Sequence, residues 1–254
     1  TTTAEGQQHK LYYDTVPRSR RLANGVPPAR AYRHSLPSRH SGPYTLRPEE
    51  AEAGMHAWFH NVYLSDLKPG TAYYLTVVSD GERSEEFHFV TAPDTNVPVK
   101  VLAVGDSRTP RVKGLEGTQR AHPENTRRQV NALMRRQLEA HPTIVALLHG
   151  ADYTNKAHWG ELYWWLKDHT EMTTTAANRL LPIIPARGNH DLDIGFEEMF
   201  WWPERQNDYY YTTHLNAQAA VITLNTEISR GGDQREWLEA QLEALRPDKR
   251  WLMA

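Results

Sequence analysis

The stretch Pro185-Ala186-Arg187-Gly188-Asn189-His190-Asp191 decides the fold that this sequence predicts. It completes an apolar run, Leu181-Pro182-Ile183-Ile184-Pro185-Ala186, that is typical of a short buried strand. The asparagine, histidine and aspartate should therefore emerge at the carboxyl end of that strand, where open α/β sheets place their chemistry. Gly188 would allow a sharp turn there. Taken alone, the stretch could also be a simple turn capped by its asparagine and aspartate.

Two earlier stretches have the same layout, which favours a shared site over isolated turns. The apolar run 99–104 is followed by Gly105-Asp106-Ser107-Arg108, and the run 143–148 is followed by His149-Gly150-Ala151-Asp152. Each predicted strand thus delivers a carboxylate or an amide at its carboxyl end. We expect the three strand ends to converge on one site.

Length, charge and composition bound the function. A chain of 254 residues is long enough for two domains. Its formal charge of −2, with both signs interspersed, predicts neither nucleic-acid binding nor attraction to an anionic membrane. No run of about 18 apolar residues occurs, so no membrane-spanning helix is predicted. The first residue is Thr1 and no signal-peptide pattern follows it, which we interpret as an N-terminus that has been processed or trimmed.

The sequence contains no cysteine, which limits the chemistry of any site. Thiolate metal ligands, disulfides and cysteine nucleophiles are excluded. A metal must therefore be held by oxygen and imidazole nitrogen, and these donors suit Fe, Mn, Zn or Mg.

The N-terminal part, to about Pro93, is predicted to form a small β-sandwich without a helix. Its strand-like segments alternate or are rich in aromatic and β-branched residues: 10–13, 57–64, 72–78 and 86–90. Residues 17–55 hold many Pro, Arg and Ser and little periodicity, which predicts a long irregular loop. The Arg and His residues of this loop could reach a phosphate site, or the loop could be a solvated surface segment.

The end of this part resembles a fibronectin type III domain. The resemblance rests on Leu67-Lys68-Pro69-Gly70-Thr71, the strand at Tyr73-Tyr74 and the closing segment from Phe87 to Pro93. The first two strands of such a domain are missing, which again predicts trimming at the front. We therefore assign residues 1–93 to an incomplete fibronectin type III-like sandwich, 94–98 to a linker and 99–254 to a second domain.

Strands and helices alternate after the linker. One helix would open at Pro123, stop before Pro142 and bury one apolar face: Val130, Leu133, Met134 and Leu138. A second would bury a similar face: Trp159, Leu162, Tyr163 and Leu166. A third, opened by a capping box of Asp233 and Glu236, would bury three leucines: Leu238, Leu242 and Leu245. Further strands are predicted at 209–212, 219–224 and 250–254, and the last of these should be a core strand.

With these elements placed, residues 99–254 resemble the calcineurin-like metallophosphoesterases. The resemblance is carried by Gly105-Asp106-x-Arg108, Asp152 and Gly188-Asn189-His190-Asp191, in that order and each after a strand. Together with the fibronectin-like front domain, these motifs resemble those of purple acid phosphatases and their bacterial counterparts. The implied fold is α/β, a four-layer αββα sandwich beside the smaller all-β domain. The resemblance also implies export, either to the periplasm or out of the cell.

The resemblance implies an activity and a role for each motif residue. The activity is metal-dependent hydrolysis of phosphoric esters, of acid phosphatase or phosphodiesterase type, without a covalent enzyme intermediate. Two metal ions, of Fe, Mn or Zn, would activate a water as hydroxide for in-line attack. Asp106 would ligate the first ion, Asp152 would bridge both and Asn189 would bind the second. His190 would protonate the leaving alkoxide, with Asp191 fixing its tautomer.

Three other polar residues near the motifs have alternative interpretations. Arg108 could bind a phosphate oxygen in bidentate fashion, or it could form a structural ion pair. Arg187 is a weaker candidate for the same task. His149 is more typical of a core or turn histidine than of a metal ligand.

The sequence departs from the family pattern at three places. Ala151 stands where a glycine normally precedes the bridging aspartate. Asn155 stands where purple acid phosphatases have a metal-binding tyrosine, and Tyr153 would point elsewhere. A later histidine and a Gly-His-x-His motif should follow the strand that ends at Ala254, but His214 is the only histidine beyond the central motif. We therefore expect the chain to be a fragment, with a further C-terminal segment that supplies imidazole ligands.

Two functions from different classes are consistent with these features. The first is a metal-dependent phosphoric ester hydrolase whose complete site includes residues outside this chain. The second is a non-catalytic binding module, in which the sandwich and its Arg-rich loop recognise a partner or glycan and the phosphatase-like domain is degenerate. A histidine soon after Ala254, followed by Gly-His-x-His, would favour the first.

Overall fold

The computed structural model describes residues 1–108, 126–191, 193–203 and 209–254. The predicted start of the first helix, at Pro123, lies outside these residues. None of the helices among them is both long and apolar enough to cross a membrane.

The C-terminal part is built on two three-stranded sheets. The first is parallel, in the order β10-β9-β8, and its strands are β8 (Lys100–Val104), β9 (Ile144–His149) and β10 (Ile183–Pro185). The second has the order β11-β12-β13, with strands β11 (Tyr211–His214), β12 (Ala219–Thr223) and β13 (Trp251–Met253). In it, β12 runs antiparallel to β11 and parallel to β13. Each apolar run predicted as a strand in this part therefore forms one.

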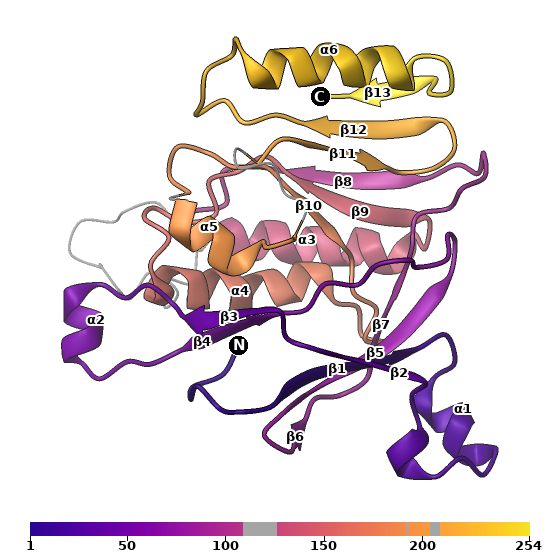
Figure 1. The fold of residues 1–254 in the computed structure, drawn as a ribbon, viewed down its shortest axis with the longest axis vertical. Helices are drawn as coiled ribbons and strands as arrows, with labels where there is room; N and C mark the ends of the chain where they lie inside the picture. Colours follow the sequence, from indigo (N-terminus) through magenta and orange to yellow (C-terminus); the bar gives the residue numbers. More distant parts are fainter. Residues whose placement is uncertain (109–125, 192, 204–208) are drawn as a thin grey trace.

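The two sheets face each other, with helices outside both (Figure 1). Helices α3 (Thr126–Ala140) and α4 (Trp159–Thr173) cover the first sheet, and α6 (Asp233–Leu245) covers the second. The short helix α5 (Asp193–Met199) follows β10. Between the sheets, apolar residues of β9 and β10 pack against those of β12: Ala146 and Ile184 against Ala219 and Val221. The order helices, sheet, sheet, helix is that of the predicted αββα sandwich.

Helix α3 buries a different face from the predicted one. Val130 and Leu133 are exposed, whereas the polar residues Arg127 and Asn131 are buried. Both can be buried because they hydrogen bond to Asp168 of α4. Arg127 donates to its carboxylate, and Asn131 donates to its backbone carbonyl. Of the four apolar residues predicted to face inward, only the last two do so: Met134 and Leu138.

Three smaller expectations about these elements are wrong, the last of them in part. In α4, Tyr163 is exposed instead of buried. The N-cap of α6 is Gly232, without a side-chain cap, so Asp233 and Glu236 do not form the predicted capping box. Strand β13 lies at the end of its sheet order among the described residues, and only part of it is in the core, because Trp251 is 62% exposed whereas Met253 packs against the core between the sheets.

The N-terminal part contains an antiparallel sheet and a separate strand pair. The sheet has the order β2-β1-β5-β6, and β7 also pairs with β5; its strands are β1 (His9–Asp14), β2 (His34–Pro37), β5 (Ala72–Ser79), β6 (Glu82–Arg83) and β7 (Phe87–Val90). The pair consists of β3 (His40–Pro43) and β4 (Trp58–Asn61).

Residues 17–55 are not the irregular loop that the sequence predicted. They contain β2, β3, α1 (Arg18–Ala23), the 3₁₀ helix η1 (Pro28–Arg30) and α2 (Pro48–Glu52). The expectation of a helix-free N-terminal part is therefore wrong. Elements of one or two turns are too short to produce a hydrophobic period, which explains why the pattern missed them.

The N-terminal part packs directly on α4. Phe59 of β4 belongs to the same hydrophobic cluster as Trp159 and Leu162 of α4. The first turn of α4 is also held by the N-terminal part, because Trp159 N donates to Thr45 O at 2.9 Å. This contact fixes the helix at the end nearest to the ends of β8, β9 and β10 (Figure 1).

Candidate active site

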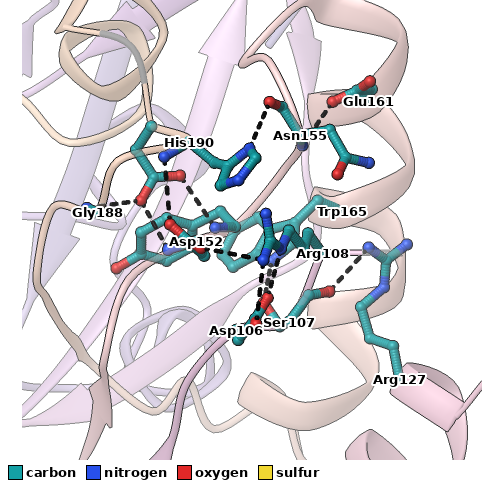
Figure 2. Close-up of polar contacts among 12 residues, drawn as sticks. Asp106, Ser107, Arg108, Arg127, Asp152, Asn155, Glu161, Trp165, Gly188 and His190 are labelled. Atoms are coloured by element: carbon teal, nitrogen blue, oxygen red, sulfur yellow. Dashed lines mark hydrogen bonds and ion pairs between the residues drawn. The ribbon is translucent and has the colours of Figure 1, made fainter. Parts of the chain in front are cut away.

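The carboxyl ends of β8, β9 and β10 come together, as the three motifs predicted (Figure 2). The loops after β8 and β9 are joined by two backbone hydrogen bonds of 3.0 Å, from Asp106 N to Ala151 O and from Arg108 N to Asp152 O. The loop after β10 joins them, because His190 N donates to Asp152 Oδ1 at 3.3 Å. Asp106, Arg108, Asp152 and His190 therefore share one site.

The backbone of this site adopts a conformation that side chains disfavour. Asp106, Ala151 and Asp152 have φ values of 48°, 73° and 56°, in the left-handed region. For residues other than glycine this region costs roughly 1–2 kcal/mol, with Asp tolerated better than Ala. Strained backbone of this kind is common at functional sites, and it persists only where the surrounding structure holds it in place. At Ala151 it also shows why the family pattern has a glycine there.

Arg108 lies between the two carboxylates that were predicted to bind metal. Its Nε donates to Asp106 Oδ1 at 2.7 Å, and its Nη2 lies 3.6 Å from Asp152 Oδ2. The hydrogen bond to Asp106 raises the pKa of the Arg108 guanidinium. The Asp106 side chain is 61% exposed and that of Asp152 only 15%, so the pair opens toward solvent on the Asp106 side. In the structure Arg108 therefore forms ion pairs with both carboxylates.

Asp191 has a different partner from the predicted one. Its buried carboxylate accepts three backbone hydrogen bonds, from Asp152 N (2.8 Å) and Gly188 N (3.0 Å) on Oδ2 and from Tyr153 N (3.0 Å) on Oδ1. Burial raises the pKa of Asp191 to about 6 even though these donors favour the ionised form. Asp191 therefore fastens the loop after β9 to that after β10, and it does not orient the imidazole of His190.

The imidazole of His190 is oriented by a backbone carbonyl instead. Its Nδ1 lies 3.0 Å from Asn155 O (Figure 2). A carbonyl oxygen can only accept, so the contact is a hydrogen bond when Nδ1 carries the hydrogen. Asn155, where the resemblance predicted a tyrosine, thus contributes its main chain to the site. Its own N–H donates to Glu161 Oε2 at 2.8 Å.

Gly188 is required because the space beside it is occupied, and not because its backbone turns sharply. Its φ is not in the left-handed region. A Cβ added at this position would collide with the carboxylate of Asp152 and press on the side chain of Ala151. The central motif therefore carries a glycine because β10 and β9 end so close together.

A network of buried polar side chains holds the loop after β8 in place. Ser107 Oγ lies 2.8 Å from His149 Nε2 and accepts a hydrogen bond of 2.8 Å from Trp165 Nε1. Arg127 Nη1 donates to Ser107 O at 3.2 Å (Figure 2). Its Nη2 donates to Asp168 Oδ2 at 2.6 Å. Ser107 sits between Asp106 and Arg108, so this network fixes the segment that carries both.

The remaining sequence candidates lie around this core. His149 is a buried core histidine, as expected, and burial lowers its pKa to about 3. Tyr153 is fully buried and stacks on His149 with ring centroids 3.9 Å apart, so it points away from the carboxylates. Asn189 is exposed beside His190. His214 lies on β11, in the second sheet.

The metal-ligating side chains that the structure brings together form only part of a site for a hard metal ion. Among the described residues, no three His, Asp or Glu side chains converge closely enough to hold a metal ion by themselves. Asp106 and Asp152 do converge, since a single guanidinium reaches both, and this shared cation shows that the pair attracts positive charge. Carboxylate and amide oxygens fit Mg, Mn, Fe or Zn. Asp106 and Asp152 are therefore the two predicted ligands that the described contacts bring together, and for Asn189 the structure shows only that it is exposed beside His190.

Sequence reasoning missed Glu161, Trp165 and the pair of Arg127 and Asp168. Glu161 stands in the first turn of α4, where an acidic residue is common for reasons of helix stability alone. Arg127 and Asp168 lie 41 residues apart, and nothing in the pattern of either helix relates them. These residues are recognised only once the helices are packed.

A parallel sheet whose strand ends gather carboxylates, an arginine and a histidine is the site expected of a metal-dependent phosphoesterase. The family model for calcineurin-like phosphoesterases matches residues 99–254. The chain belongs to the calcineurin-like phosphoesterase family, whose members use divalent or trivalent metal ions.

Individual proteins match this chain at low sequence identity. The uncharacterized proteins MT2654 and Rv2577 of two Mycobacterium tuberculosis strains are each 23% identical over 227 residues, covering 78% of this chain and 42% of each relative. The solved structure of purple acid phosphatase PPD1 from yellow lupin (Lupinus luteus) seeds is similar with a TM-score of 0.64 at 17% identity, covering 98% of this chain and 45% of that chain. For PhoD the TM-score is 0.55 at 10% identity, with 98% and 55% covered. At such identities the likeness shows the fold alone. The chain spans about half the length of the proteins it matches.

Proposed function

We propose that this chain carries part of the active site of a metal-dependent hydrolase of phosphoric esters. The observation that supports this most is the convergence of Asp106 and Asp152 on one cation, Arg108, at the ends of two parallel strands and beside His190. Family membership supports the reaction class. Strained backbone at both aspartates supports a functional role for them over a structural one.

Asp106, Asp152 and Asn189 would hold two metal ions, of Fe, Mn or Zn. When bound, such ions activate water and neutralise charge on the phosphoryl group. Arg108 lies among the same residues and offers a planar pair of donors, so it would bind a phosphoryl oxygen of the substrate.

His190 would supply the proton for the leaving group. Hydrolysis breaks the bond between phosphorus and the ester oxygen, adds a hydroxyl to phosphorus and leaves the ester oxygen to be protonated. The Nδ1 hydrogen of His190 is directed at Asn155 O, so Nε2 is the ring nitrogen that would carry the transferred proton. Asp191, through its three backbone hydrogen bonds, would keep the loops after β9 and β10 together during this step.

The test is turnover of a chromogenic monoester and diester, 4-nitrophenyl phosphate and bis(4-nitrophenyl) phosphate, by the whole protein with added Mn²⁺, Zn²⁺ or Fe²⁺. We expect one of the two to be cleaved, and Asp152→Asn to abolish cleavage without unfolding the protein. Asp94→Asn, on an exposed carboxylate of the linker, is the matched control and should leave turnover unchanged. If the wild-type protein cleaves neither ester with any of these ions, the hydrolase proposal fails and the alternative of a non-catalytic binding module is favoured.

A further inference from the structure

We infer that Glu161 is a positioning residue for His190 and acts through the backbone carbonyl of Asn155. Glu161 belongs to none of the motifs that carry the family resemblance, and it lies on a helix instead of a strand end. The inference rests on the proposed function, because it concerns the histidine that would protonate the leaving group.

The geometry is a short series of hydrogen bonds. Glu161 Oε2 accepts from Asn155 N at 2.8 Å and from Lys156 N at 2.9 Å. The Lys156 N–H lies in the same peptide unit as the Asn155 carbonyl and the Asn155 N–H lies in the preceding one, so the two bonds hold the backbone on both sides of the Asn155 Cα. The carbonyl oxygen of Asn155 lies 3.0 Å from His190 Nδ1 (Figure 2). A single carboxylate oxygen thus sets the direction of the carbonyl that holds the imidazole.

Glu161 is itself held in a fixed place. It stands in the first turn of α4, and the residue before it, Gly160, donates its N–H to Glu50 Oε1 of α2 at 3.1 Å. Glu50 is buried and also accepts from Arg47. The N-terminal part of the chain therefore supports the helix turn that orients His190, although it contributes no side chain to the group of Asp106, Arg108 and Asp152.

The chemical consequence concerns the tautomer of His190. As the acid, the ring carries hydrogen on both nitrogens. A fixed carbonyl acceptor holds the Nδ1 hydrogen, so Nε2 faces the substrate and gives up its proton, and the neutral ring that remains keeps its hydrogen on Nδ1. Without Glu161, the N–H groups of Asn155 and Lys156 would hydrogen bond to water instead. The Asn155 carbonyl would then lose its fixed direction. The ring would then populate both tautomers and several orientations, which lowers the rate of a proton transfer that depends on geometry.

The kinetic test uses the whole protein and two esters of the class that it cleaves, one with 4-nitrophenol and one with an alkyl alcohol as leaving group. Only the alkoxide needs a proton to leave. We expect Glu161→Ala to lower kcat for the alkyl ester by about 10- to 100-fold, as for other residues that orient a functional histidine, and to change kcat for the nitrophenyl ester and both KM values much less. Glu161→Gln keeps an acceptor oxygen and should restore most of the rate.

A double-mutant cycle separates positioning from general damage. In a His190→Ala background, Glu161→Ala should cause no further loss on the alkyl ester, because both substitutions remove the same step. Equal losses on the two esters, or losses that add in the double variant, would overturn the inference.

An NMR measurement detects the tautomer of His190 directly and does not depend on activity. The ¹⁵N shifts of the ring nitrogens should show His190 with hydrogen on Nδ1 in the metal-free wild-type and Glu161→Gln proteins, and a mixture of tautomers in Glu161→Ala. An unchanged tautomer in Glu161→Ala would refute the positioning role even in an active enzyme. If the tautomer changes in a protein that cleaves no ester, the proposed function fails and the positioning role stands.

Discussion

The buried carboxylate of Asp191 accepts a hydrogen bond of 2.8 Å from the backbone N–H of Asp152. Two strand ends are joined by this contact, and two further N–H groups donate to the same carboxylate. The aspartate that closes the central motif is therefore part of the frame of the site. Its neighbour His190 is the residue that faces the reaction in the proposed function.

Replacing Asp191 should be costly for folding. Asp191→Ala leaves three backbone N–H groups without their acceptor in a buried place, and we expect the free energy of unfolding to fall by about 3 kcal/mol. Urea unfolding of the metal-free protein measures this. The control is Asp80→Ala, since Asp80 also accepts two backbone hydrogen bonds but in an exposed place, and it should cause a much smaller loss. Equal effects would mean that burial of the Asp191 network does not matter.

Arg108 should affect substrate binding more than folding. A charge-assisted hydrogen bond contributes about 1.5–3 kcal/mol, so Arg108→Gln should raise KM for a phosphate ester by roughly 10- to 100-fold. Arg108→Lys keeps the charge but not the planar pair of donors, and it should recover only part of the loss. Steady-state kinetics would contradict this role if both variants kept the wild-type KM.

Acid should destabilise the protein through His149. Burial lowers its pKa from 6.5 to about 3, so the folded protein keeps the ring neutral while the unfolded chain takes up a proton below pH 6.5. The stability from this group is fully present above pH 6.5 and is lost as the pH falls toward 3, by up to about 1.4 kcal/mol per pH unit. His149→Gln removes the titration, so its unfolding free energy should depend less steeply on pH between 6 and 4. Identical slopes in the two proteins would rule out this contribution.

Gly160 should resist a substitution that helices normally favour. In a helix interior, alanine is more favourable than glycine by about 0.5–1 kcal/mol. A Cβ at Gly160 would collide with Glu50 Oε1, so we expect Gly160→Ala to destabilise the protein by about 1–3 kcal/mol. In a Glu50→Ala background the same change should become neutral or stabilising. Thermal unfolding of the four proteins tests this, and a stabilising effect in the wild-type background would contradict the contact.

The part of the site that follows from strand ends was predictable from the sequence. Parallel strands end at one edge of a sheet, so apolar runs followed by Asp106, Asp152 and His190 place these residues together whatever the loops do. This rule depends only on local patterns and on a property of parallel sheets. The second sheet, in which β11 and β12 are antiparallel, was expected from the family resemblance and not from this rule.

The partners of those side chains could not be predicted in the same way. Asp191 was expected to contact its neighbour His190, but both of its oxygens are taken by backbone N–H groups that the close approach of β9 and β10 brings to it. Arg127 was not among the residues predicted to be buried on its helix, since only apolar residues were used to define the buried face, yet it is buried and donates to Asp168. Contacts of this kind depend on distances between elements, which periodicity does not contain.

The central claim is that Asp106 and Asp152 jointly hold metal ions, and calorimetric titration of the whole protein with Mn²⁺ and Zn²⁺ tests it most directly. We predict saturable binding to the wild-type protein, loss of that binding in the folded Asp106→Asn and Asp152→Asn variants, and unchanged binding in Asp94→Asn. Binding to Asp152→Asn with wild-type affinity, or no binding to the wild-type protein, would contradict the claim.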